Sequence, residues 1–151
     1  SIDATLLVRP FDIVALNGGA HRIATVSNEL GAYQGYVGAA RRQWAISNQR
    51  TVVSYIRSYR RALAWLFNPR NKDAALQIYI RNMDGATLEQ ARQAYNMLVA
   101  SPDGIERSAR FSLRGAEQVV MLRRQHGGPS WSTLSTAKVY YDDSFYRRSS
   151  K

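Results

Sequence analysis

Ile2-Asp3-Ala4-Thr5-Leu6-Leu7-Val8-Arg9-Pro10-Phe11 opens the chain with an apolar run that turns at a proline. The run over residues 2–8 favours a β-strand, because apolar and β-branched side chains suit a pleated, half-buried surface. Pro10 suits the first turn of a helix, because its fixed φ matches that position and its missing N–H needs no partner there. The stretch therefore predicts a strand that runs into a helix, the repeating step of an α/β fold.

The corner formed by Arg9, Pro10 and Phe11 is the first predicted ligand site. Ligands of open α/β sheets bind beyond the carboxyl ends of strands, and a helix N-terminus presents free N–H groups that favour anions. Arg9 would add a permanently charged, bidentate contact to a sulfonate, phosphate or carboxylate. The alternatives are a surface arginine in a loop at Arg9 and a purely structural helix start at Pro10.

Two further short strands are predicted at residues 23–26 and 35–40, where β-branched or small residues gather. From about Gln43 the apolar period changes from two to 3.6, which indicates helices as far as His126. We therefore expect a helix-rich α/β fold with about three short strands followed by four or more helices. We also expect the sheet partners of the opening strand to come from residues outside this sequence.

Caps and turn residues set the bounds of the predicted helices. A short helix follows Pro10, and four longer ones run from Ser47 or Asn48 to Asn68, from Asn71 to Asp84, from Thr87 to Ser101 and from Ser112 to His126. Thr87 with Gln90 three residues later is the pattern of a capping box. Ser112 is expected to cap the last of these helices.

The longest predicted helix has one apolar face and one basic face. Its apolar face combines Val52, Ile56, Tyr59, Leu63 and Leu66. This stripe predicts a core contact, and we expect Tyr59 and Trp65 to be core residues. The arginines of the helix fall largely off the stripe, at Arg50, Arg57, Arg60 and Arg61.

The composition is that of a globular chain with a strong basic excess. The 151 residues carry 21 basic and 11 acidic side chains, a net charge of +10, and only Lys72, Lys138 and Lys151 among the basic residues are lysines. The excess raises nucleic acid, an acidic membrane or an anionic ligand as partners. Because no basic run exceeds two residues, a solvated, arginine-rich surface is the preferred interpretation over a nucleic-acid face.

Catalytic and metal chemistry find little support in the residue types. The chain has no cysteine, which excludes disulfides, cysteine-ligated zinc and thiol nucleophiles. His21 and His126 are far apart, and no carboxylate pair at helical spacing accompanies them, so neither a metal site nor a nucleophile with its base is predicted. We therefore expect no enzyme activity, no cofactor and no metal.

No apolar stretch reaches the roughly 18 residues of a membrane-spanning helix.

Several short segments follow one another in an order that is found in a known protein family. They are Asp3 to Leu7, Arg9 to Phe11, Tyr33, Ala40 to Ala45, Asn48 to Trp65, Asn71 to Ala75, and Tyr140-Tyr141-Asp142 with Phe145. This order resembles the C-terminal half of periplasmic substrate-binding proteins of ABC importers. The most similar branch is the one that binds aliphatic sulfonates, taurine, nitrate and thiamine precursors. The resemblance covers nearly the whole chain and lies in order and spacing, because each segment is short and mostly apolar.

The resemblance implies the C-terminal portion of a two-lobed, type II periplasmic binding fold that closes like a hinge on a small molecule. Residues 1–34 would end the second lobe, and residues 35–151 would form the return strand and the helices that clad the first lobe. Tyr33 and Gln34 would lie at the crossing between the lobes and touch the ligand there. Ordinary hinge packing is the alternative role for these two residues.

The expected function is that of the solute-binding component of an ABC importer, present here as a fragment. It would bind a small anionic or polar organic molecule and deliver it to a membrane permease. The resemblance implies a periplasmic or an exported, membrane-anchored protein whose signal segment is absent from this chain, with no nucleic-acid partner. The alternative is an arginine-rich helical module that binds nucleic acid. We also expect possible self-association of the isolated fragment, because an unpaired strand exposes backbone N–H and C=O groups.

Overall fold

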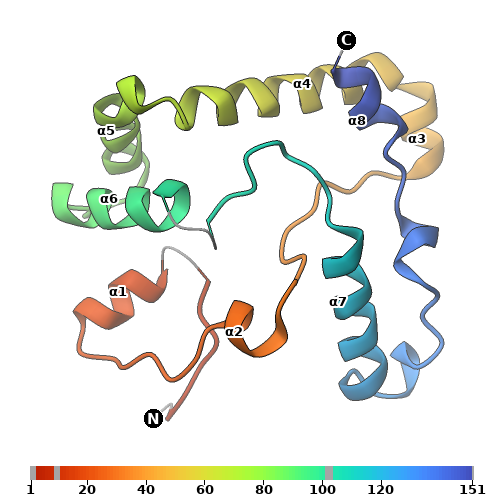
Figure 1. The fold of residues 1–151 in the computed structure, drawn as a ribbon, viewed down its shortest axis with the longest axis horizontal. Coiled ribbons are helices and arrows are strands. Elements are labelled where there is room, and N and C mark those ends of the chain that lie inside the picture. Colours follow the sequence, from red (N-terminus) through yellow and green to blue (C-terminus); the bar gives the residue numbers. More distant parts are fainter. Residues whose placement is uncertain (1–2, 9–10, 101–103, 151) are drawn as a thin grey trace. The chain divides into compact units, whose positions relative to one another are not determined.

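A computed structural model describes residues 3–8, 11–100 and 104–150 of the chain (Figure 1). The chain divides into two compact units. The first consists of Ser1–Ile23 and Leu63–Arg107, and the second consists of Ala24–Ala62 and Ser108–Lys151. Each unit therefore combines two segments that are distant in sequence. The predicted division after residue 34 stays a prediction.

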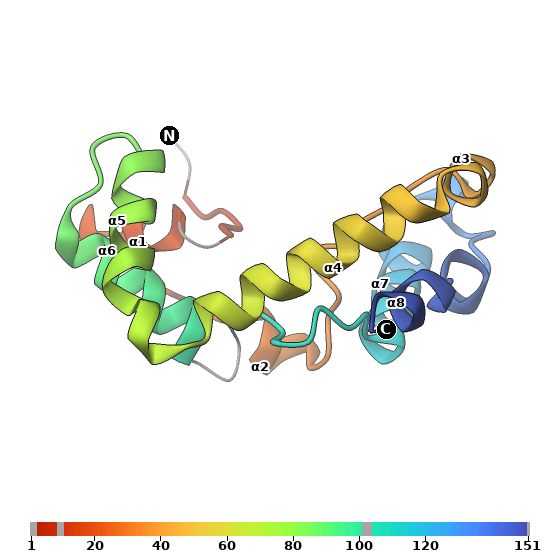
Figure 2. The same ribbon diagram turned by 90° about the horizontal axis from the view of Figure 1, so that it is seen from above.

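The first unit is built from short helices around α5 and α6. Its elements are α1 (Phe11–Asn17), the end of α4 (Gln49–Leu66), the 3-10 turn η1 (Pro69–Asn71), α5 (Lys72–Asn82), α6 (Leu88–Tyr95) and the π-helical η2 (Asn96–Ala100). Helices α5 and α6 lie side by side in both views (Figure 1, Figure 2). The core of the unit is small and consists of Ile13, Leu63, Leu76, Ala91, Ala94 and Val99.

Side-chain caps fix the starts of two elements in this unit. The Thr87 hydroxyl accepts a hydrogen bond from the Gln90 N–H at 3.2 Å, and the Gln90 amide oxygen accepts one from the Thr87 N–H at 2.9 Å. The predicted capping box is thereby confirmed. The Asn68 side-chain oxygen accepts from the Arg70 N–H at 3.1 Å and caps η1. Asn71 makes no such cap for α5; its amide donates to the Trp65 carbonyl at 2.8 Å and ties η1 to the last turn of α4.

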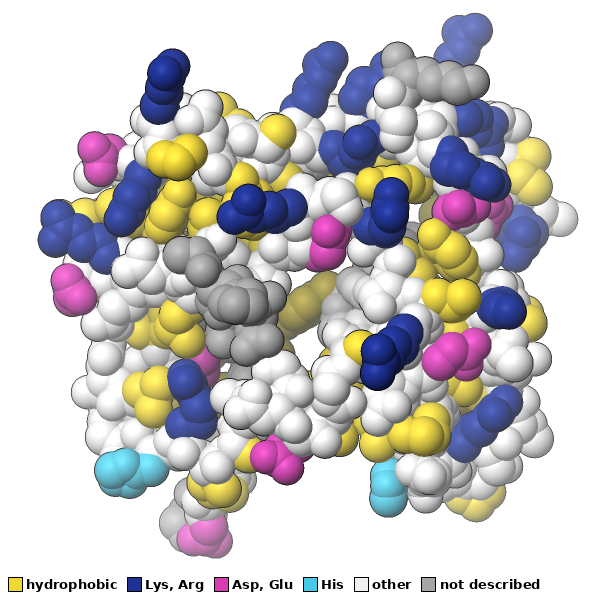
Figure 3. Space-filling model, in the orientation of Figure 1, with side chains coloured by type: hydrophobic (Ala, Val, Ile, Leu, Met, Phe, Trp, Pro, Cys, Tyr) yellow, Lys and Arg dark blue, Asp and Glu magenta, His cyan; other side chains and the backbone are white. Residues whose placement is uncertain are grey.

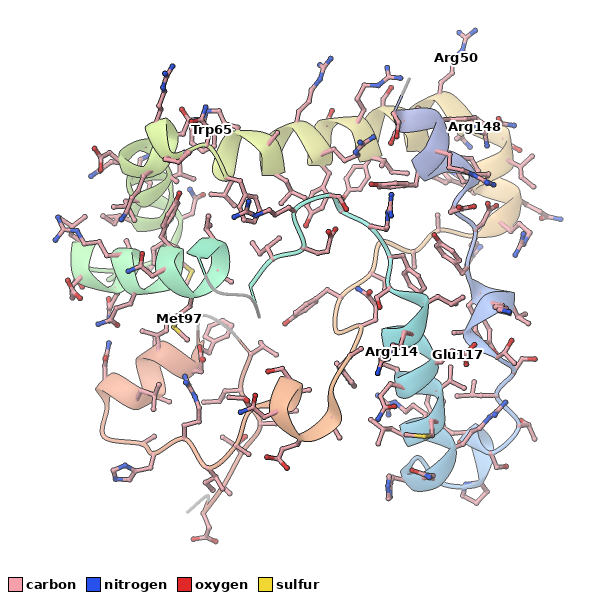
Figure 4. The ribbon with its side chains drawn as sticks, in the orientation of Figure 1. Arg50, Trp65, Met97, Arg114, Glu117 and Arg148 are labelled. Carbon is pink, nitrogen blue, oxygen red and sulfur yellow. The ribbon has the colours of Figure 1, made fainter. Side chains whose placement is uncertain are left out.

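The second unit carries most of α4 together with α7. Its other elements are α2 (Val26–Leu30), α3 (Arg42–Ser47), α7 (Leu113–His126), the 3-10 turns η3 (Pro129–Trp131) and η4 (Ala137–Tyr140), and α8 (Ser144–Ser149). The Glu117 carboxylate of α7 accepts from the Ala137 N–H at 3.0 Å and so holds η4 (Figure 4). Ser112 caps α7 as predicted, because its hydroxyl accepts from the Gly115 N–H at 3.1 Å.

Helix α4 forms as predicted but its apolar face is poorly covered. It is one unbroken helix (Figure 2), and Leu63 is its only buried residue. Tyr59 is 47% exposed and Trp65 is 39% exposed, so the prediction that both are core residues is wrong. Helical periodicity identifies which face is apolar, whereas burial depends on what packs against that face.

The predicted α/β fold is wrong. The chain is 63% helical, and no β-strand occurs in residues 3–8, 11–100 or 104–150. Residues 3–8, 23–25 and 35–40 have no regular secondary structure, and Val26 of the second predicted strand begins α2. A strand obtains its hydrogen bonds from a neighbouring strand, so β-branched composition alone does not produce one. The predicted two-lobed α/β architecture loses its structural basis with these strands.

Large apolar side chains are exposed in segments that have no regular secondary structure. They include Leu6 at 80%, Ile23 at 86% and Tyr36 at 73% exposure.

Candidate functional site

The predicted ligand-binding residues fall in different parts of the chain. Arg9 and Pro10 lie outside the described residues. Phe11 begins α1 in the first unit and is 55% exposed. Tyr33 and Gln34 belong to the second unit. Only Tyr33 and Gln34 are therefore held together within one compact unit, and the five residues together stay a predicted site.

Gln34 connects the segment that contains it to the first turn of α7. Its side-chain oxygen accepts from the Ser112 N–H at 2.9 Å, and its amide nitrogen donates to the Tyr36 carbonyl at 2.7 Å. Both ends of the amide thus have partners inside the protein. The Gln34 side chain therefore serves to position the segment, while the ring of Tyr33, 44% exposed, faces solvent in part.

Gly115 permits the close approach at this corner. A Cβ at that position would lie 2.8 Å from the Gln34 nitrogen and 3.1 Å from the Tyr33 carbonyl carbon, both backbone atoms. A glycine inside a helix costs about 1 kcal/mol relative to alanine. The close packing of the Tyr33 and Gln34 backbone on α7 accounts for the glycine at position 115. This contact is therefore structural.

A second candidate site is the basic face of α4. Arg50, Arg57 and Arg61 follow at positions i, i+7 and i+11, which places them on one face of the helix. We call these three residues the arginine row. Arg50 and Arg61 are exposed and Arg57 is partly exposed. Basic side chains project from the outer edge of α4 (Figure 3), and Arg50 points away from the ribbon (Figure 4).

The arginine row has no partner among the residues that the structure describes. Within the described residues, none of the three side chains makes a hydrogen bond, an ion pair or a ring contact. Helix α4 itself contains no aspartate or glutamate. The sequence had already separated these arginines from the apolar stripe, but it did not distinguish them from Arg60.

Arg60 is used inside the protein instead. Its guanidinium donates to the hydroxyls of Ser149 at 3.2 Å and Ser150 at 2.8 Å, and it lies 5.0 Å from the centre of the Tyr146 ring. Other arginines are also engaged within their own unit, through ring contacts, carbonyls or carboxylates: Arg22, Arg107, Arg123, Arg124, Arg147 and Arg148. Much of the basic excess is therefore structural.

The C-terminal segment packs through aromatic and capping contacts. The rings of Phe111 and Tyr141 stack at 4.5 Å, and the Tyr146 hydroxyl donates to the Ser108 carbonyl at 2.8 Å. Burial raises the pKa of the Tyr141 phenol. Hydrogen bonds from the backbone and side chain of Ser144 lower the pKa of the Asp142 carboxyl. Both groups keep their ordinary charge at neutral pH, so neither is tuned for proton transfer.

The depressions beside α3 and at the start of α4 are open, and metal-binding clusters are not found in the described ranges. The two best-formed depressions are open to solvent, one beside Arg41 and Trp44 and one along residues 46–51. No group of three or more histidine, cysteine or carboxylate side chains is close enough to hold a metal ion in the described residues. Among the helices that the structure describes, none combines the length and apolarity required to cross a membrane.

Comparison with known protein families, with curated proteins and with solved structures found no match for this chain.

Proposed function

We propose that this chain belongs to the solute-binding component of an importer, where it contributes binding surface and no chemistry. The solute would be a small anionic or polar organic molecule, recognised by a few placed polar groups. Preferential contacts with a closed state would drive closure around it. A periplasmic or exported location and delivery to a membrane permease belong to the same proposal.

One observation supports the proposal: large apolar side chains are exposed in the segments without regular secondary structure. They include Leu6, Ile23 and Val37. Apolar groups in such number are normally covered by another protein surface. A chain with so many uncovered apolar side chains is suited to complete a binding site together with other polypeptide.

The order of sequence segments from Asp3 to Phe145 is the reason for choosing an importer. Within that proposal, Arg9 supplies charge to an anionic solute and Tyr33 supplies an aromatic wall. Gln34 holds Tyr33 in place through its bonds to Ser112 and Tyr36. This division of roles separates residues that touch the solute from a residue that positions them.

Thermal unfolding of the complete natural protein that carries this sequence tests the proposal. Sulfonates, taurine, nitrate and pyrimidine precursors are added one at a time. A binding solute at a hundred times its Kd stabilises the folded state by about 2.7 kcal/mol. Arg9→Gln and Tyr33→Ala should reduce that stabilisation, whereas Arg81→Gln, on an exposed position of α5, should leave it unchanged.

The proposal fails if no solute of this panel stabilises the protein at millimolar concentration. It also fails if Arg81→Gln reduces the response as much as Arg9→Gln, because the effect would then follow net charge and not a site.

A nucleic-acid-binding module is the second candidate, and the arginine row is the observation that favours it. The internal contacts of Arg60, Arg107 and Arg123 reduce the charge that is free for phosphates. Binding of duplex or single-stranded nucleic acid that falls steeply with salt would support this candidate. A flat response to salt would exclude it.

A further inference from the structure

The arginine row of α4 costs the protein stability where it stands. Arg50 lies in the first turn of α4, next to the positive end of the helix dipole, and no acidic residue shares that turn. A cation at this end is unfavourable. Arg57 and Arg61 are like charges at spacing i, i+4, which is also unfavourable in a helix. Residues that destabilise a helix and make no compensating contact inside the protein are typical of functional positions.

An anionic partner would remove both penalties. The row extends about 16 Å along the axis, at a rise of 1.5 Å per residue. Ser54 lies between Arg50 and Arg57 on the same face, and its short side chain lets a partner approach closely. Arginine pairs with phosphate in a bidentate geometry that lysine cannot reproduce. The charge, spacing and residue type fit a surface that repeats phosphate groups.

The residue types of the face supply phosphate contacts and little base reading. Single-stranded nucleic acid is bound in a basic groove with aromatic side chains for stacking, whereas the depression along residues 46–51 is open and reaches only Arg50 of the row. Reading of adenine in a duplex uses asparagine or glutamine at the base edge. The face between Arg50 and Arg61 carries only arginine, serine and small or apolar residues.

We infer that the arginine row of α4 binds the phosphate headgroups of an anionic lipid bilayer, so that the protein adsorbs to the membrane through Arg50, Arg57 and Arg61. The choice of a bilayer over a polynucleotide rests on the proposed function, since an importer component works beside a membrane. Adsorption leaves α4 on the surface and requires no insertion. Screening by salt should weaken it, because the interaction is electrostatic.

Vesicle co-sedimentation of the full chain tests the inference, with vesicles of phosphatidylcholine alone and with one third phosphatidylglycerol. Each basic side chain near an anionic leaflet contributes about a factor of five in affinity. The triple variant Arg50→Gln, Arg57→Gln, Arg61→Gln should therefore bind anionic vesicles about a hundredfold more weakly. Neutral vesicles should bind neither protein.

A matched control removes the same charge elsewhere. Arg70, Arg81 and Arg92 are exposed and, within the described residues, make no side-chain contact. The triple variant Arg70→Gln, Arg81→Gln, Arg92→Gln should keep binding within about fivefold of the parent, because these three residues lie outside the row and together should contribute no more than one residue at the membrane surface does. Circular dichroism should show unchanged helicity in both variants.

Three results overturn the inference. Equal losses in the two triple variants would show that net charge alone drives adsorption. Binding to anionic vesicles that survives loss of the row would place the contact elsewhere. Binding of duplex DNA that depends on the row, with no binding of vesicles, would make polynucleotide the partner. The assay contains no small solute, so its failure is distinct from failure of the proposed solute binding.

Discussion

Two polar clusters of the second unit differ in where their partners are. At the start of α7, Gln34, Ser112 and Gly115 satisfy one another through hydrogen bonds and close backbone contact. On α4, the arginine row has no partner in the described residues. The first cluster is explained by folding alone, whereas the second works against folding. Polar groups left open at a cost to stability are the better candidates for binding.

Gly115→Ala should have the largest effect on stability. The new Cβ would lie 2.8 Å from the backbone nitrogen of Gln34, which cannot move aside like a flexible side chain. Because backbone atoms must move, the cost lies near the upper end of the range for overpacking, about 3 kcal/mol, and the better helix propensity of alanine offsets about 1 kcal/mol of it. The expected net loss is about 2 kcal/mol. Urea unfolding monitored by circular dichroism measures the difference.

Gly38→Ala is the matched control, because nothing lies within 4 Å of a Cβ at Gly38. Its unfolding free energy should stay within about 0.5 kcal/mol of the parent. Equal unfolding curves for the two variants would contradict the close packing assigned to Gly115.

Gln34→Ala should have a smaller effect of the same sign. It removes the bonds to Ser112 and Tyr36, and a lost hydrogen bond costs about 0.5–1.5 kcal/mol. Gln43→Ala serves as control, because Gln43 is exposed. Urea midpoints that shift equally in both variants would remove the structural role of the Gln34 amide.

Arg50→Gln should change stability less than Gly115→Ala or Gln34→Ala, and in the opposite direction. It removes a cation from the positive end of α4, which is worth about 0.3–1 kcal/mol in favour of the folded state. The same variant should weaken adsorption to anionic vesicles about fivefold. Thermal unfolding at low ionic strength measures the first effect, and a loss of stability there would show that Arg50 has a structural role.

Helices α4, α5, α6 and α7 could be predicted from sequence because their signals are local, whereas α2 begins inside a predicted strand and α8 has no predicted counterpart. Thr87 with Gln90 and Ser112 with Gly115 lie within one turn, and each pair forms as its pattern indicates. The strand predictions were wrong, since residues 3–8 and 35–40 would need hydrogen-bonding neighbours that local composition does not reveal. No strand forms at these positions in the described residues.

The candidate sites show the same limit. Periodicity placed Arg50, Arg57 and Arg61 off the apolar stripe of α4, together with Arg60. It could not show that Arg60 reaches Ser149 and Ser150, about ninety residues later in the chain, because that contact is tertiary. The role proposed for Tyr33 depends on a solute and stays a prediction.

Arg60 and Arg61 allow the most direct comparison, because they are neighbours of equal charge on one helix. Arg60→Gln should lower the unfolding free energy by about 1–2 kcal/mol, since it loses charged hydrogen bonds, and should change vesicle binding little. Arg61→Gln should raise the unfolding free energy slightly, by about 0.2–0.5 kcal/mol, because it removes the repulsion from Arg57, and should weaken binding to anionic vesicles about fivefold. If both variants weaken binding equally and neither loses stability, internal contacts do not distinguish structural from binding arginines in this protein.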